Sequence, residues 1–289
     1  MYSHTPVMKD EVLAYLAPPP DGFTVDLTTG LGGHSAAIAE RLAAGGRLLC
    51  RDRDREALEM ARRNLAPWAD RIIFDLGPIS ELVPSLARLG LPKPGGLLAD
   101  LGVSLYQLKA PERGFSFRED GPLDMRMSKE QELTAHDIVN FYSEKELADL
   151  IYKYGEERRS RRIARAILRA RPVPGTLSLA TIVEQAVPRE GRMHPATLTF
   201  QALRIAVNNE LEEVESLVTL IPEVVAPGGR VVVIAFHSLE DRIVKRGFQA
   251  LARSGRGELL NKHVVTASED EARRNVASRS AKLRALRLS

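Results

Sequence analysis

The chain has 289 residues, of which 44% are hydrophobic and 27% charged, as is typical of soluble globular proteins with one large or two ordinary domains. Its net charge of +3 is compatible with an anionic partner, and its single cysteine, Cys50, excludes a disulfide framework or a thiolate metal cluster within the chain. No apolar run reaches the length of a membrane helix and the first residues lack a signal-peptide pattern. We therefore expect a cytoplasmic protein and assign no metal ligands.

The first strong pattern is a strand, a glycine-rich turn and a helix. The apolar run from Phe23 to Leu27 predicts a buried strand, and the glycines within residues 30–33 predict a sharp turn before a helix at 35–42. Such a turn lets backbone approach a ligand closely. An acid about 20 residues further on, Asp52, favours a ligand site over a connection that needs glycines only for its turn.

Strand and helix patterns then alternate. Strands are predicted at 47–50, 71–74 and 96–101, and helices at 55–65 and 80–89. The last of these strands is apolar along its length, as expected for a strand buried on both faces of a parallel sheet. The order predicts an α/β fold with a doubly wound parallel sheet and right-handed crossovers.

The alternation stops after the fourth strand. Residues 106–195 show only helix and loop patterns, and Ser178 is predicted to cap the last helix. The other helices of this region are predicted at 134–140, 144–154 and 156–170. We therefore expect a helical domain, residues 106–195, inserted into an α/β domain made of residues 1–105 and 196–289.

The sheet pattern returns near the C-terminus. An amphipathic stretch at 196–221 leads to a strand at 231–236, and a helix with Ser238 as its N-cap follows. Final strands are predicted at 261–266 and 281–288, joined by a polar segment that is loop or partly helical.

Two cofactor classes use a glycine turn followed by an acid that binds ribose: dinucleotides and S-adenosylmethionine. The third glycine of the dinucleotide pattern is missing here. Asp26, just before the turn, would be poorly placed beside a pyrophosphate and well placed beside a cationic amine. These points favour S-adenosylmethionine, while the dinucleotide stays the alternative.

Two side chains are predicted at the carboxyl edge of the sheet, where open α/β sheets bind ligands. Asp100 ends the fourth strand and is a candidate proton acceptor, with a capping role as the alternative. His237 ends the fifth strand and is as compatible with capping or packing as with catalysis. Cys50 lies beside the ribose acid, wrongly placed to attack a pyrimidine, so an exocyclic amine or a ribose hydroxyl is the expected methyl acceptor if the substrate is a nucleic acid.

A group of arginines forms the strongest charge feature. Arg158, Arg161, Arg162, Arg165 and Arg169 share one face of the helix predicted at 156–170. Such a face favours contact with phosphates, and a solvated face relieved by two preceding glutamates is the alternative. Nearby, the rings of the segment 113–117 could stack an extruded base or anchor the loop to the core.

Long motifs occur in order along nearly the whole chain. The longest are Asp26-Leu-Thr-Thr-Gly-Leu-Gly-Gly-His-Ser35, Arg113-Gly-Phe-Ser-Phe117, Asp120-Gly-Pro-Leu-Asp-Met-Arg-Met127 and Phe236-His-Ser-Leu-Glu-Asp-Arg-Ile-Val244, and shorter ones lie at 4–7, 11–13, 52–54, 100–104, 107–108, 154–158, 194–197, 199–205 and 278–284. In these motifs the chain resembles the RsmH family, also called MraW. Its members are bacterial methyltransferases that modify the N4 amine of a cytosine in the decoding region of 16S ribosomal RNA.

The resemblance implies a class I S-adenosylmethionine-dependent methyltransferase fold, a Rossmann-like doubly wound sheet, with an inserted all-helical substrate-recognition domain. The residues implied to bind the cofactor are Gly32, Gly33, His34, Asp52, Ile79, Asp100 and Gln107. Together with the arginine face, the candidates for contact with the RNA substrate are Arg113, Phe115, Arg158, Arg162, Arg165, His194 and His237. The implied partner is 16S rRNA in the small ribosomal subunit, and the oligomeric state, a homodimer included, is left open, as is assistance by a metal.

Several positions depart from the family pattern. Ile79 stands where a phenylalanine often flanks the adenine, Arg51 where a small or apolar residue is common, and Leu198 where an arginine is usual. Further departures lie at Leu105-Tyr106, Lys109 and Asn275-Val-Ala.

Three rival functions stay open. Two are enzymes: a methyltransferase acting on another RNA, and a nucleotide-linked dehydrogenase if the glycine turn binds a dinucleotide. The third is an RNA-binding assembly factor whose methylation site has decayed, and the intact glycine turn with Asp52 and Asp100 argues against it.

Overall fold

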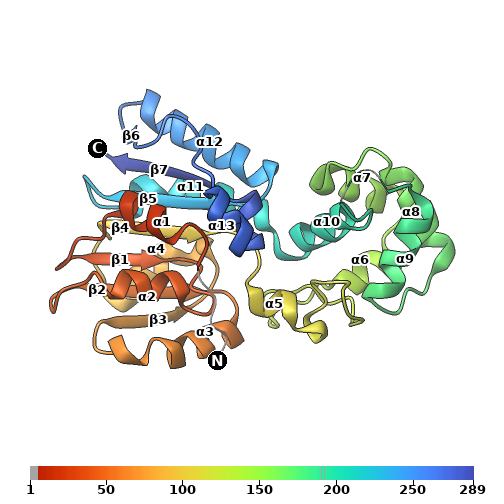
Figure 1. The fold of residues 1–289 in the computed structure, drawn as a ribbon, viewed down its shortest axis with the longest axis horizontal. Helices are drawn as coiled ribbons and strands as arrows, with labels where there is room; N and C mark the ends of the chain where they lie inside the picture. The colour runs from red at the N-terminus through yellow and green to blue at the C-terminus, as the bar shows by residue number, and fades with distance from the viewer. Residues whose placement is uncertain (1–5, 190, 192) are drawn as a thin grey trace. The chain divides into compact units, whose positions relative to one another are not determined.

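The computed structural model describes residues 6–189, 191 and 193–289, and the first motif at 4–7 therefore lies partly outside the described residues. The described chain forms two compact units (Figure 1). Unit 1 consists of residues up to Gly102 together with 211–289, and unit 2 of Val103–Glu210. Within the described residues, no helix has both the length and the apolar character needed to cross a membrane.

Unit 1 is built on a seven-stranded sheet, counted over the described residues, with the order β3-β2-β1-β4-β5-β7-β6. The strands are β1 (Phe23–Asp26), β2 (Arg47–Asp52), β3 (Ile72–Leu76), β4 (Gly96–Asp100), β5 (Arg230–Ala235), β6 (Gly257–Leu259) and β7 (Lys282–Leu288). Strands β1 to β5 are parallel, and β7 runs antiparallel to both β5 and β6. The expected α/β class and the doubly wound sheet are confirmed.

Each face of this sheet is covered by helices and carries its own apolar core. Along β5, Val231 and Val233 belong to one core, and Val232 and Ile234 to the other, because successive side chains of a strand point to opposite faces. The helices of this unit are α1 (Lys9–Leu16), α2 (Gly33–Ala39), α3 (Arg55–Asn64), α4 (Leu82–Leu89), α11 (Glu210–Val224), α12 (Ser238–Arg253) and α13 (Glu269–Arg274). Residues of α1, α2 and α3 contribute to one core, and residues of α4, α11 and α12 to the other.

Two C-terminal expectations for this unit are wrong. The strand predicted at 261–266 is absent from the described structure except for an isolated bridge between Val265 and Leu283. The reason is Asn261, whose side-chain amide occupies β7: its Oδ1 accepts from the Ala285 amide at 2.7 Å and its Nδ2 donates to the Leu283 carbonyl at 3.1 Å. The N-cap of α12 is His237, not Ser238, because the His237 imidazole accepts from the Glu240 amide.

Unit 2 is helical and has a single apolar core within the described residues. Its helices are α5 (Leu105–Lys109), α6 (Ala135–Phe141), α7 (Glu144–Gly155), α8 (Ser160–Ala170), α9 (Thr176–Ala186) and α10 (Thr197–Asn208). The helices predicted at 134–140 and 144–154 are confirmed as α6 and α7. Helix α8 begins later than predicted because Glu156 takes a left-handed backbone conformation (φ 52°) and ends α7. Ser178 lies inside α9, so it is not the cap.

The amphipathic stretch at 196–221 is two helices rather than one. Asn209, with φ 50°, ends α10, and α11 begins at the next residue. Helix α10 packs on α7 so closely that a Cβ on Gly155 would lie 2.6 Å from the Leu198 carbonyl oxygen. The compact helical unit therefore extends to Glu210, beyond the boundary expected at residue 195.

Candidate active site

Three aspartates end three adjacent parallel strands of unit 1. Asp52 ends β2, Asp26 ends β1 and Asp100 ends β4. In the order β2-β1-β4 these strands are neighbours, so their carboxyl ends lie at one edge of the sheet. The chain crosses to the other half of the sheet between β1 and β4, and this switch point is where open α/β sheets bind ligands.

The turn after β1 requires its glycines. Gly30 and Gly32 have φ values of 52° and 88°, and a Cβ on Gly32 would lie 3.0 Å from the Leu65 side chain. The Gly30 amide donates to Oδ2 of Asp52 at 2.7 Å, and the Asp54 amide donates to Oδ1 at 2.8 Å. Burial raises the pKa of Asp52 to about 6 in spite of these two hydrogen bonds.

Asp26 shapes the turn from inside. Its side chain is fully buried and accepts from the Ser35 hydroxyl at 2.6 Å and from the Thr28 amide at 3.2 Å. Burial raises the pKa of this carboxyl above its ordinary value. The expectation that Asp26 lies directly beside a cationic amine is therefore wrong: its carboxylate is enclosed by the turn that it organises.

His34 and Asp100 are adjacent at this edge. His34, in the first turn of α2, places Nε2 3.6 Å from Oδ2 of Asp100, and the Asp100 amide donates to the Thr28 hydroxyl at 2.6 Å. Burial lowers the pKa of His34, but the Asp100 and Asp26 carboxylates outweigh it, so the pKa lies above its ordinary value. These two neighbouring carboxylates therefore favour the imidazolium form of His34.

Both residues also carry buried polar atoms that are available to a ligand. Neither ring nitrogen of His34, nor Oδ1 of Asp100, has a hydrogen-bond partner among the described residues. Buried polar atoms are nearly always paired in native proteins, so these atoms are suited to pair with a ligand. An elongated ligand with both hydroxyl and charged polar groups fits this row of carboxylates, imidazole and glycine backbone.

Ile79 lies in the loop after β3 and belongs to the apolar core. The Gly77 amide of this loop donates to the Asp52 carbonyl at 2.9 Å, so the loop begins beside the ribose-acid candidate. The Arg51 side chain anchors this loop. Its guanidinium is buried, donates twice to the Pro78 carbonyl (3.1 and 2.9 Å), and pairs with Asp75. This explains an arginine where a small residue was expected.

Gln107, the last predicted cofactor residue, is in unit 2. It is buried and forms a capping box at the start of α5, in which the Ser104 amide donates to its Oε1 at 2.9 Å and its own amide donates to the Ser104 hydroxyl. The predicted cofactor residues Gly32, Gly33, His34, Asp52, Ile79 and Asp100 are all in unit 1.

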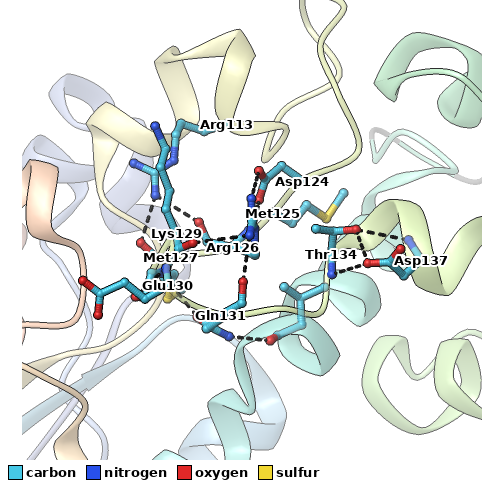
Figure 2. Close-up of polar contacts among 12 residues, drawn as sticks. Arg113, Asp124, Met125, Arg126, Met127, Lys129, Glu130, Gln131, Thr134 and Asp137 are labelled. Carbon is cyan, nitrogen blue, oxygen red and sulfur yellow. Dashed lines mark hydrogen bonds and ion pairs between the residues drawn. The ribbon is translucent and has the colours of Figure 1, made fainter.

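Two predicted RNA contacts prove to be interior residues of unit 2. The Arg113 side chain is 1% exposed, and its Nη2 donates to the carbonyls of Arg126 and Met127, each at 2.9 Å (Figure 2). Phe115 is 7% exposed and lies in the core. These side chains anchor the loop, as the alternative interpretation of the 113–117 segment had it, and neither is accessible to a phosphate or a base.

The motif at 120–127 has a structural explanation of the same kind. Arg126 makes a bidentate ion pair with Asp124, with both N–O distances 2.9 Å, and donates to the Gln131 carbonyl at 2.7 Å (Figure 2). Burial alone would raise the pKa of Asp124, but the hydrogen bonds from Arg126 hold it below its ordinary value. This network orders the loop that leads into α6.

The arginines near α8 are exposed, as predicted. Arg162, Arg165 and Arg169 lie on the helix, whereas Arg158 precedes it. Within the described part of the chain, Arg165 has a distant carboxylate neighbour, Glu144 at 3.7 Å, and Arg158, Arg162 and Arg169 form no ion pair.

Of the two histidines predicted to contact RNA, His194 lies just before α10 and His237 caps α12. Nδ1 of His194 accepts from the Ala196 amide at 3.2 Å just before α10, and its ring packs on Phe117 at a centroid distance of 4.8 Å. His237 caps α12, and its Nε2 lies 3.2 Å from Oε1 of Glu240. A contact of either residue with RNA stays a prediction.

Sequence reasoning missed Thr28 as a site residue. Its hydroxyl accepts from the Asp100 amide and so links the glycine turn to the end of β4. The signal was the threonine in the motif Asp26-Leu-Thr-Thr-Gly30, which periodicity alone does not distinguish from an ordinary loop residue.

Comparison with known proteins identifies the family. The model of the MraW methylase family matches residues 1–289. A relative from Solibacter usitatus, named ribosomal RNA small subunit methyltransferase H, is 54% identical over 99% of both chains. Relatives of the same name from Koribacter versatilis and Dehalococcoides mccartyi are 51% and 46% identical, over 98% of this chain and 93% and 86% of theirs. The sheet order and the match over the whole length agree: this chain has the class I methyltransferase fold and belongs to the MraW methylase family.

Proposed function

We propose that this protein transfers a methyl group from S-adenosylmethionine to the exocyclic N4 amine of a cytosine in the decoding region of 16S rRNA. The names of its relatives support small-subunit rRNA as the substrate. The observation that carries the proposal is the edge of the sheet at which Asp52, His34 and Asp100 surround a glycine turn, with buried polar atoms left for a ligand.

The chain fits S-adenosylmethionine as the methyl donor. Asp52 is placed to accept hydrogen bonds from ribose hydroxyls, because its carboxylate ends β2 and each oxygen has capacity beyond the single amide that it now accepts. The backbone at Gly32 and Gly33 allows close approach of the ligand. The anionic edge suits a cationic ligand, and a contact of Ile79 with an adenine stays a prediction, because this side chain is buried in the core.

The described site also bears on the choice of methyl acceptor. S-adenosylmethionine, when bound, supplies an electrophilic methyl group on a sulfonium centre. Attack at carbon 5 of a pyrimidine requires a cysteine thiolate, and Cys50 is buried, with burial raising the pKa of its thiol above the ordinary range. An exocyclic amine or a ribose hydroxyl needs no such nucleophile, which favours these acceptors over carbon 5.

We assign Asp100 as the acceptor of the proton that the amine releases. Its Oδ1 has no partner among the described residues, and its side chain is 23% exposed. Nε2 of His34 lies 3.6 Å from the other oxygen, Oδ2. As the N–C bond forms and the S–C bond breaks, the amine proton passes to this carboxylate.

Unit 2, with the exposed Arg158, Arg162 and Arg165, is proposed to recognise the RNA. Arginines that form no close ion pair on an exposed face are suited to phosphates, since guanidinium groups match phosphate oxygens in a bidentate geometry. His194 and His237 are retained as candidate RNA contacts, and His237 also caps α12.

The proposal is tested with rRNA from a strain lacking the gene. Purified protein is incubated with methyl-labelled S-adenosylmethionine and either naked 16S rRNA or assembled small subunits, and the nucleosides are analysed by mass spectrometry. We expect label in N4-methylcytidine. Label in a 2′-O-methyl or 5-methyl nucleoside would refute the position, and no label in either substrate would refute the activity. Protein with Asp100→Ala is the control for a contaminating enzyme.

A further inference from the structure

Helices α8 and α9 lie side by side in unit 2 (Figure 1). Residues of both helices line a groove. Its volume is about 570 Å³. This lies within the ~300–1,000 Å³ typical of small-molecule sites. The residues proposed to bind the methyl donor, Asp52 and Asp100, do not line it.

The α8 wall of the groove is cationic. Arg162, Arg165 and Arg169 line it at helical spacing, and no acidic residue is among the described residues that form the lining. Arg162 and Arg169 form no ion pair within the described chain, and the Glu144 carboxylate is 3.7 Å from Arg165. Three like charges along one helical face repel each other, so an anion in the groove is favoured.

The rest of the lining is not what a phosphate alone would need. Ala166 and Ala170 between the arginines are small, and Ile182 and Ala186 of α9 form an apolar wall opposite. Gln185, exposed on α9, adds an amide that can both donate and accept. A ligand that fits this lining has an anionic part, a flat apolar part and a polar edge.

We propose that this groove binds one unstacked nucleotide of the substrate RNA, distinct from the cytosine that is methylated. Its phosphate contacts Arg165 and Arg169, its base lies against the guanidinium planes and the alanine and isoleucine surface, and Gln185 bonds the edge of the base. Recognition of RNA commonly uses bases splayed out of the stack in this way, including on arginine planes. The inference rests on the proposed function, because it takes the partner to be the RNA substrate.

The test separates the effect of the groove's charge on RNA affinity from the effect of its shape. The probe is a labelled single-stranded RNA of about twelve nucleotides, within the site sizes of such proteins. Ala170→Leu fills the groove and keeps every charge, whereas Arg169→Ala removes a groove cation. Arg161→Ala is the matched control, since it removes an exposed arginine of the same helix that does not line the groove. Circular dichroism checks that each variant is folded.

We expect Ala170→Leu and Arg169→Ala each to weaken binding about tenfold, the order of one stacked base, and Arg161→Ala to weaken it about twofold at most. Only Arg169→Ala changes the salt dependence. RNA carrying 4-thiouridine should crosslink to the segment 182–186. Wild-type affinity in Ala170→Leu, or crosslinks that avoid this segment, would overturn the groove assignment.

A parallel measurement separates this inference from the proposed function. Methyl transfer by the unaltered protein to 16S rRNA tests the function and does not depend on the groove variants. If transfer occurs and the groove variants bind like wild type, the groove assignment is wrong and the function stands. If transfer does not occur while the 182–186 crosslink does, the proposed function fails and the groove remains a nucleotide site.

Discussion

The raised pKa of Asp52 makes cofactor affinity depend on pH. Without a ligand this pKa is about 6, chiefly because burial disfavours the charged carboxylate, with the Asp54 and Asp26 charges adding to the effect. Ribose hydroxyls donate hydrogen bonds to the ionised carboxylate, so binding selects that form. About nine-tenths of the protein is ionised at Asp52 at pH 7 and about one-tenth at pH 5.

Affinity for S-adenosylmethionine should therefore be about tenfold weaker at pH 5 than at pH 7, or about 1.4 kcal/mol. Isothermal titration calorimetry at pH 5, 6, 7 and 8 measures this directly. The control is Asp52→Asn, which should bind more weakly at pH 7 and lose this pH dependence. That variant is needed because the pKa of nearby His34 is also raised. An affinity independent of pH, or the same dependence in Asp52→Asn, would refute the reasoning.

The stability of the ligand-free protein checks the same pKa independently. A carboxyl whose pKa rises from 3.8 in the unfolded chain to about 6 binds its proton more tightly when folded. The free energy of unfolding should therefore fall as the pH rises through that window, by up to about 3 kcal/mol from Asp52. Urea unfolding of the wild type and of Asp52→Asn at pH 4 and 7 isolates this contribution. Equal pH dependence in the two proteins would show that Asp52 does not carry it.

Three further predictions follow from individual contacts. Asp100→Ala should lower methyl transfer about 100-fold or more with an unchanged melting temperature; undiminished turnover removes Asp100 from the mechanism. Arg113→Met loses two charged hydrogen bonds to buried carbonyls and should cost about 3 kcal/mol in urea unfolding; an unchanged midpoint contradicts its structural role. Arg162→Ala combined with Arg165→Ala should reduce the slope of log affinity against log salt for single-stranded RNA by about 1.4. An unchanged slope would show that these arginines of α8 are solvated and do not contact phosphates.

The α/β pattern of unit 1 was predictable from the sequence because its signals are local. Strands such as β4 are continuous apolar runs, and the turn after β1 needs glycines at positions with positive φ whatever surrounds them. Parallel strands of one sheet have their carboxyl ends at the same edge, so Asp52 and Asp100 could be placed at that edge from the sequence. The helices α6 and α7 were likewise set by their own periodicity and caps.

Only the tertiary structure decided the roles of several polar side chains. Arg113 and Arg162 are the same residue type, yet Arg113 donates to the carbonyls of residues 126 and 127 and is buried, whereas α8 holds Arg162 exposed. Asn261 ends a predicted strand because its amide reaches β7, far along the chain. A buried polar group forms a hydrogen bond with whichever partner tertiary packing brings within reach. A local sequence pattern therefore cannot predict that partner.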